Sequence, residues 1–107
     1  MTTFDDRERA FEAKFAHDQD MQFRVTARRN RLLGEWAAGL MKLTPEEADA
    51  YKKAVVQADF EEAGDEDVVR KVVGDLTSAG VDTDEAAVRV ALSEKSAEAR
   101  RQIMQDI

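Results

Sequence analysis

The sequence holds few residues whose types and spacing could carry out catalysis. His17 is the one histidine and there is no cysteine. The residues therefore do not supply the ligands of a transition-metal site, and a cysteine nucleophile is excluded. A Ser-His-Asp triad would need a serine from the distant half of the chain, at Ser78, Ser93 or Ser96. Two interpretations of His17 remain. It is either a solvated surface side chain or a pH sensor, and the second is possible because histidine titrates near neutrality. The five glycines are scattered and form no phosphate-binding loop. We therefore expect a protein that is not an enzyme and has no cofactor.

The acidic stretch at residues 59–65 invites a calcium-loop interpretation. If an EF-hand began at Asp59, Gly64 would occupy the sixth position, as required. The twelfth position would then be Arg70, where a metal-binding carboxylate is needed. The pattern fails, and we expect a solvated acidic helix end and no metal site.

Three arginines, Arg24, Arg28 and Arg31, share one helical face, and Arg29 lies beside them. A nucleic-acid patch is one interpretation. However, no aromatic platform interleaves with these arginines, and the whole chain carries a net charge of -7. Nucleic-acid binding usually needs clustered positive charge on a basic domain. We expect these arginines to pair with acidic helices or an acidic partner, and we expect no nucleic-acid partner.

Residues 1–19 form an N-terminal arm with a different pattern. Phe4, Phe11 and Phe15 stand at i, i+7 and i+11, which places them on one helical face. No glycine or proline precedes Gly34, so the arm could extend the first helix. An apolar stripe of three phenylalanines must be buried, either in the core of this protein or in a groove on a partner. The aromatic residues are interleaved with charged ones, namely Asp5, Asp6, Arg7, Glu8, Arg9, Glu12 and Lys14.

The composition of the chain indicates which class of fold positions these candidate residues. The chain has 107 residues, of which 43% are hydrophobic and 36% charged, as expected of one domain of amphipathic helices. No apolar run approaches the roughly 20 residues that span a bilayer, so we expect no direct membrane insertion. The first residues lack the basic and apolar regions of a signal peptide, and we expect a cytoplasmic location.

Residues typical of helix starts and helix ends predict four helices along the chain. Thr44-Pro45-Glu46-Glu47 is typical of a helix start with a capping box, and Gly80 is typical of a helix end. Between these signals the apolar residues recur at helical spacing, as in Val69, Val72, Val73 and Leu76. We predict an all-α fold, a small four-helix bundle over residues 20–107, with antiparallel neighbours. The predicted helices are 20–42, 45–62, 65–79 and 83–106.

The sequence resembles one known family along essentially its whole length. The resemblance rests on five segments taken together: FDDRERAFEAKFAHD at 4–18, ARRNRLLG at 27–34, WAA at 36–38, ADFEEAGD at 58–65 and ARRQIM at 99–104. These are similar to the zeta subunit, the inhibitor of the F1Fo-ATP synthase of alphaproteobacteria.

The resemblance implies a four-helix bundle with a mobile N-terminal segment. In the family that segment inserts into the F1 sector at an alpha/beta catalytic interface beside gamma, and stops rotation in the ATP-hydrolysing direction. It therefore implies a monomeric inhibitor bound to F1 at the inner face of the cell membrane. The family is also associated with weak binding of ATP or ADP, and a nucleotide-sensing module is the alternative function, although no motif here carries it. The implied F1-binding residues are Phe4, Asp5, Asp6, Arg7, Glu8, Arg9, Phe11, Glu12, Lys14 and Phe15.

Overall fold

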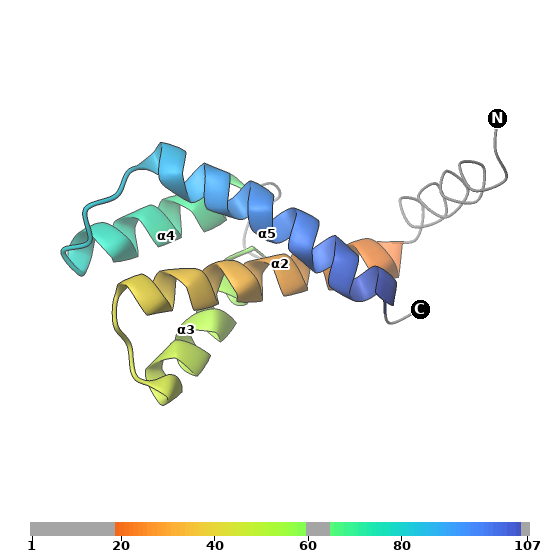
Figure 1. Cartoon of the computed structure of the whole chain (residues 1–107), viewed down its shortest axis with the longest axis horizontal. Coiled ribbons are helices and arrows are strands. Elements are labelled where there is room, and N and C mark those ends of the chain that lie inside the picture. Colours follow the sequence, from red (N-terminus) through yellow and green to blue (C-terminus); the bar gives the residue numbers. More distant parts are fainter. Residues whose placement is uncertain (1–18, 60–64, 106–107) are drawn as a thin grey trace, which may run out of the picture.

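Helices account for most of the part of the chain that the structure, a computed structural model, describes: residues 19–59 and 65–105. In these ranges there are four helices and no strand (Figure 1). The helices are α2 (Gln19–Leu40), α3 (Pro45–Ala58), α4 (Glu66–Ser78) and α5 (Glu85–Gln105). The predicted all-α, four-helix fold is confirmed.

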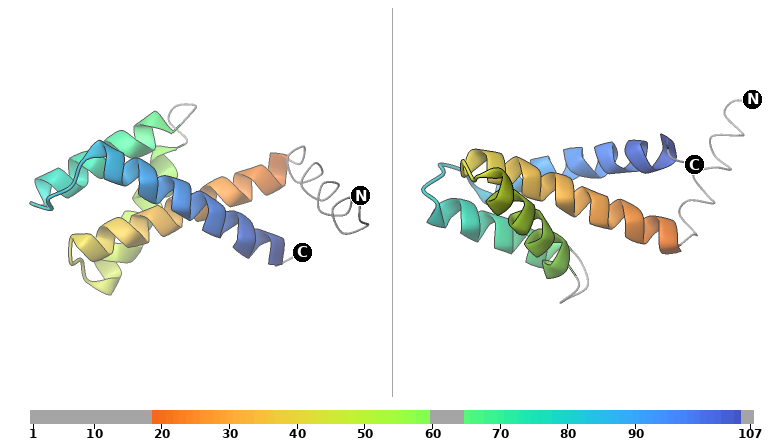
Figure 2. Two further views of the ribbon diagram at one scale, coloured as in Figure 1. Left: turned by 45° about the horizontal axis from the view of Figure 1, so that its top comes forward. Right: turned by 90° about the horizontal axis from the view of Figure 1, so that it is seen from below.

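Helix α2 organises the packing. It lies between α3 and α5, and it also touches α4 (Figures 1 and 2). Helices α2 and α4 run in one direction and α3 and α5 in the other, so sequential neighbours are antiparallel, as short connections require (Figure 1).

The core is built from the apolar faces of all four helices. The predicted valine and leucine spacing of α4 is borne out, because Val72 and Leu76 are fully buried. In α2, Leu33 and Ala37 are fully buried, whereas Leu40, which continues the same spacing, is 42% exposed. The buried cluster comprises Leu33, Ala37, Val55, Val68, Val69, Val72, Leu76, Val88, Ala91 and Leu92.

Two of the predicted helix ends have the expected chemistry. At the start of α3, the Glu47 amide donates to Thr44 Oγ1 at 3.2 Å, and the Thr44 amide donates to Glu47 Oε1 at 2.9 Å. This is the predicted capping box. After α4, Gly80 takes a positive φ of 80° and the Val81 amide donates to the Leu76 carbonyl at 3.0 Å. Glycine tolerates that conformation without a Cβ clash.

Other predicted boundaries are shifted. Helix α2 ends at Leu40 rather than 42, because Lys42 adopts φ 58° and the Leu43 amide donates back to the Ala38 carbonyl at 3.1 Å. Helix α5 begins at Glu85 rather than 83, and its first turn is capped by Asp84, whose Oδ1 accepts from the Ala87 amide at 2.8 Å.

The α3–α4 connection also departs from the prediction. Helix α3 ends at Ala58, and residues 60–62 of the predicted helix lie outside the described residues. Helix α4 begins at Glu66, after Asp65 at the N-cap position. Asp65 makes no side-chain capping bond, because its carboxylate binds an arginine of α2.

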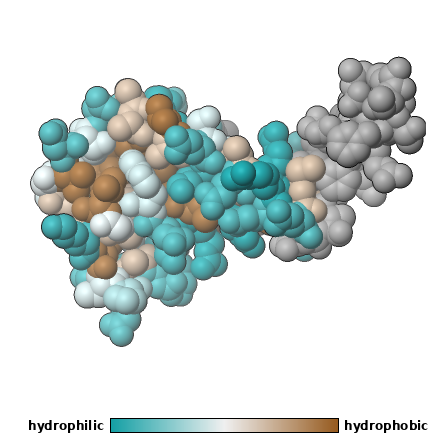
Figure 3. Space-filling view, in the orientation of Figure 1, coloured by the Kyte–Doolittle hydropathy of each residue, from teal (hydrophilic) through white to brown (hydrophobic). Residues whose placement is uncertain are grey.

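The face of the bundle shown in Figure 3 changes character along its length. On this face hydrophobic side chains gather where α2 ends and α5 begins, and hydrophilic ones predominate where α2 begins and α5 ends. None of the helices in the described ranges is long and apolar enough to cross a membrane.

Candidate functional site

Arg29 lies almost buried where α2 faces both sides of the α3–α4 connection, at 9% exposure. Its Nη1 donates to Asp65 Oδ1 at 2.9 Å, and its Nη2 lies 3.8 Å from Asp59 Oδ1. One guanidinium therefore ties the end of α3 and the start of α4 to the middle of α2. Asp59 and Asp65, the two described residues of the acidic stretch, thus have a structural role that the sequence did not indicate, although the Asp65 side chain remains 51% exposed.

Asn30 continues this polar cluster away from the ion pairs. Its Oδ1 accepts from Arg29 Nε at 3.0 Å, which fixes the amide orientation. Its Nδ2 makes no hydrogen bond to any residue that the structure describes, although Asn30 is only 1% exposed. A buried donor without an acceptor is costly, and such groups are rare in native proteins. Asn30 Nδ2 thus marks a place where a ligand oxygen would be stabilised.

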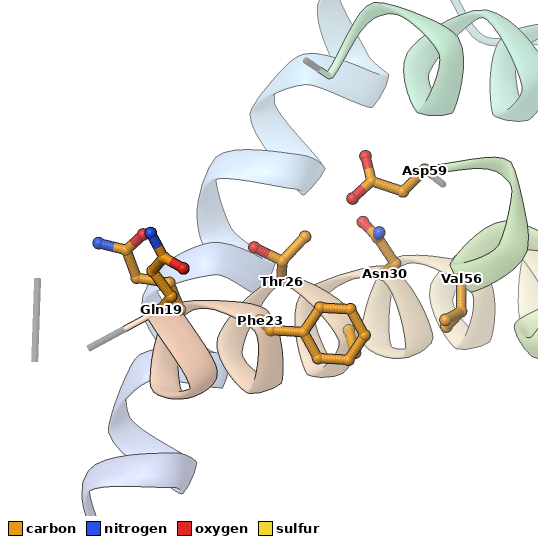
Figure 4. Close-up of a pocket in the computed structure, with 8 residues that line it drawn as sticks. Gln19, Phe23, Thr26, Asn30, Val56 and Asp59 are labelled. Atoms are coloured by element: carbon orange, nitrogen blue, oxygen red, sulfur yellow. The ribbon is translucent and has the colours of Figure 1, made fainter. Parts of the chain in front are cut away.

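A pocket opens beside Asn30, between the first turns of α2 and the end of α3. It has a volume of about 320 Å³. Asn30 and Asp59 point toward one another, and the Phe23 ring lies along α2 toward Val56 (Figure 4). Among the described residues of the lining, Asp59 alone is charged, and it is a carboxylate. The residues around the pocket are Gln19, Gln22, Phe23, Thr26, Ala27, Asn30, Val56 and Asp59.

The other arginines of α2 have different surroundings. Arg28 Nη1 donates to Gln102 Oε1 of α5 at 2.8 Å, and Arg24 lies 4.0 Å from Asp20 one turn earlier in its own helix. Arg31 is exposed and makes no ion pair with any residue in the described ranges. Among the described residues, pairing of this arginine group with acidic residues at the ends of other helices is therefore confirmed for Arg29 alone.

Two further polar contacts join the helices of the bundle. Tyr51 of α3 donates its hydroxyl to Asp75 Oδ2 of α4 at 2.9 Å, and Lys71 lies 3.1 Å from the same carboxylate. Burial first, and then the Asp75 carboxylate, raise the pKa of the Tyr51 phenol. Arg89 of α5 bridges Glu66 Oε2 at 2.8 Å and Glu85 Oε1 at 3.0 Å. These contacts join α3 to α4 and α4 to α5.

The predicted F1-binding residues all lie outside the described residues, as does His17. Their role stays a prediction. They are Phe4, Asp5, Asp6, Arg7, Glu8, Arg9, Phe11, Glu12, Lys14 and Phe15. Sequence reasoning did not single out Phe23 or Asn30. A signal was present for Asn30, since it lies in ARRNRLLG, one of the segments that carry the family resemblance.

The described residues contain no group of three or more acidic or histidine side chains placed to hold a metal ion. What the geometry offers instead is a pocket with apolar walls, a buried amide donor and a carboxylate acceptor. That combination suits recognition of a neutral group with a hydrogen-bonding atom.

Comparison with known proteins identifies the family. The family model of the ATPase inhibitor subunit zeta matches residues 1–102. The chain belongs to this family. The zeta match includes the arm as well as the bundle, and it makes the protein an ATPase inhibitor subunit whose partner is the ATP synthase.

Solved structures support the same fold. Four chains match, among them a protein whose solution structure was determined by NMR, with 47% sequence identity and a TM-score of 0.72. The match covers 81% of this chain and 99% of that one. No curated protein matches.

Proposed function

We propose that this zeta-family protein inhibits ATP hydrolysis by inserting residues 1–19 into the F1 sector of the ATP synthase. The insertion site is an alpha/beta catalytic interface near gamma, where the arm blocks rotation sterically. The observation that carries the proposal is the family match, which spans residues 1–102 and so includes the arm. The inhibitor has no catalytic role of its own.

In this proposal the arm's residues divide into anchors and charges. Phe4, Phe11 and Phe15 bury in the partner, as aromatic residues do at the centres of interfaces. The charged residues between them set the register through pairs with F1. These are Asp5, Asp6, Arg7, Glu8, Arg9, Glu12 and Lys14.

The bundle tethers the arm and raises its effective concentration at F1. Its buried cluster is assembled from residues 33–92, which supports a bundle that folds without the arm. We further propose that the free protein is a cytoplasmic monomer that binds F1 at the inner face of the cell membrane, with alpha, beta and gamma as partners.

Deletion of residues 1–18 tests the proposal. The truncated protein should keep its helical circular dichroism and cooperative unfolding but lose inhibition of ATP hydrolysis by purified F1. Simultaneous Phe4→Ala, Phe11→Ala and Phe15→Ala changes should have the same effect. Ala13→Gln, which falls on the opposite side of the same helical spacing, is the matched control and should inhibit normally. Full inhibition by the truncated protein would refute the proposal.

Nucleotide sensing is the alternative function, and calorimetric titration with ATP and ADP tests it. The pocket gives it no support, since the part of the lining that the structure describes contains a carboxylate and neither lysine nor arginine to meet phosphates. Affinity weaker than millimolar would remove nucleotide sensing as a primary role. For a nucleic-acid role, retention on heparin at moderate salt is the corresponding test, and we expect none.

A further inference from the structure

The pocket between α2 and α3 lies directly next to the proposed inhibitory arm. Gln19, the first residue of α2, lines the pocket and is joined to residue 18 by a peptide bond. Any surface that binds residue 18 therefore comes within a few ångströms of Gln19 at the edge of the pocket.

The residue spacing of the arm also leads into the pocket. The separations between Phe4, Phe11 and Phe15 are seven and four residues, and the same two steps repeat along α2. They arrive next at Gln22 and Thr26, which line the pocket, and then at Leu33 and Ala37, which are fully buried. A repeat of eleven residues corresponds to about 3.67 residues per helical turn, close to the α-helical value. Within α2 the same spacing therefore joins two residues of the pocket to two residues of the core.

The chemistry of this middle section is only partly that of a core. Phe23 presents a large ring that is 53% exposed, and Val56 of α3 adds a second apolar surface. Deeper in the pocket, Asn30 Nδ2 has no acceptor, and the Asp59 side chain is 19% exposed. An occupant therefore needs an apolar portion against Phe23 and Val56 and an oxygen that accepts from Asn30.

We propose that this pocket is a second docking point for the inhibited ATPase, adjacent to the arm. It takes an apolar side chain of a protein segment, and a carbonyl oxygen of that segment accepts the free hydrogen bond of Asn30 Nδ2. The inference rests on the proposed function, because continuity with the arm identifies the partner. The same pocket disfavours nucleic acid and other polyanions, because Asp59 is the one charged residue among the described residues of its lining.

Two substitutions change the pocket in opposite ways. Phe23→Ala removes its exposed wall, and Ala27→Leu fills it with a good helix former. Both should raise the concentration of full-length protein needed for half-inhibition of purified F1 about tenfold, as loss of an aromatic anchor commonly does. Leu40→Ala and Val90→Ala are the matched controls, since these side chains are 42% and 58% exposed. They should inhibit like the unchanged protein.

The outcomes separate this inference from the proposed function. If the unchanged protein inhibits, the arm deletion does not and both pocket variants inhibit normally, the pocket inference is overturned while the arm mechanism stands. If the arm deletion inhibits fully, the proposed function fails first. Thermal unfolding by circular dichroism accompanies each variant, so that loss of inhibition is interpreted only for folded protein.

Photocrosslinking gives a direct second measurement that needs no weakened variant. Benzoylphenylalanine placed at position 23 of the full chain should crosslink to a subunit of purified F1. The same group at position 90, on the outer surface of α5, should not. Crosslinking from position 23 only to residues 1–18 of the same chain, or only to a second copy, would overturn the proposal.

Discussion

Replacement of Arg29 by methionine should destabilise the bundle by about 2 kcal/mol. Arg29 is 9% exposed and donates to Asp65 at 2.9 Å, and a hydrogen bond to a charged group contributes about 1.5–3 kcal/mol. Removing one member of a buried pair costs about 3–5 kcal/mol when the other charge stays buried. Here the Asp65 side chain is 51% exposed, so water compensates part of the loss and the lower figure applies.

Urea unfolding followed by fluorescence measures this directly, because Trp36 is the only tryptophan and packs against the core. With an m value of about 1 kcal/mol/M, the midpoint of Arg29→Met should fall by about 2 M. Arg31→Met is the matched control on the same helix, and its exposed side chain should give a change below about 0.5 kcal/mol.

A double-mutant cycle assigns the effect to the ion pair. Asp65→Asn alone should cost less than Arg29→Met, and the two changes together should show a coupling energy of at least about 1 kcal/mol. Equal midpoints for the Arg29 and Arg31 variants, or no coupling to Asp65, would refute the idea that this guanidinium fastens α3 and α4 to α2.

Three further predictions concern helix ends, helix contacts and pH. Residues 42 and 80 both have a positive φ, which glycine tolerates best. Gly80→Ala should therefore destabilise the bundle by about 1 kcal/mol, whereas Lys42→Gly should stabilise it by about 0.5–1 kcal/mol. Chemical unfolding measures both changes. Gly74→Ala should stabilise the bundle by about 1 kcal/mol through helix propensity, because the added Cβ would meet nothing within 4 Å. Gly34→Ala should show no such gain, because its Cβ would lie 3.0 Å from the backbone of α3. Hydrogen bonds first from the Thr44 amide and then from its hydroxyl lower the pKa of Glu47. The contribution of Glu47 to stability is therefore present above the pKa of its unfolded state and is lost as the pH falls through the lower pKa of the folded state. Thermal melts between pH 2 and 6 should therefore show a weaker acid dependence for Glu47→Ala, and an unchanged dependence would contradict this.

Local signals predicted the fold well, because they act over a few residues. The capping box at Thr44, the glycine end at Gly80 and the spacing of Val72 and Leu76 all have local physical causes. The end of α2 was misplaced because Lys42 adopts a conformation for which sequence normally uses glycine.

The candidate site was less accessible to sequence reasoning. Arg29 and Asp65 are 36 residues apart, so no local rule connects them. Asn30 and Phe23 line a pocket that exists only because α3 ends beside α2. The arm's phenylalanines, in contrast, are evident in the sequence, and their role awaits the experiments on F1.

The hydrogen bond between Arg29 Nε and Asn30 Oδ1 links the pocket to the ion-pair cluster, because one amide serves both. An acceptor that takes the Nδ2 proton would polarise this amide and make its oxygen a stronger acceptor from Arg29. Occupancy of the pocket would then strengthen the fastening between α2 and the α3–α4 connection. By reciprocity, any change that tightens the bundle at Asp65 would favour the docked state. The affinity of the inhibitor for its target and the stability of its own helical bundle would then be thermodynamically coupled, so that a change in one would be measurable in the other.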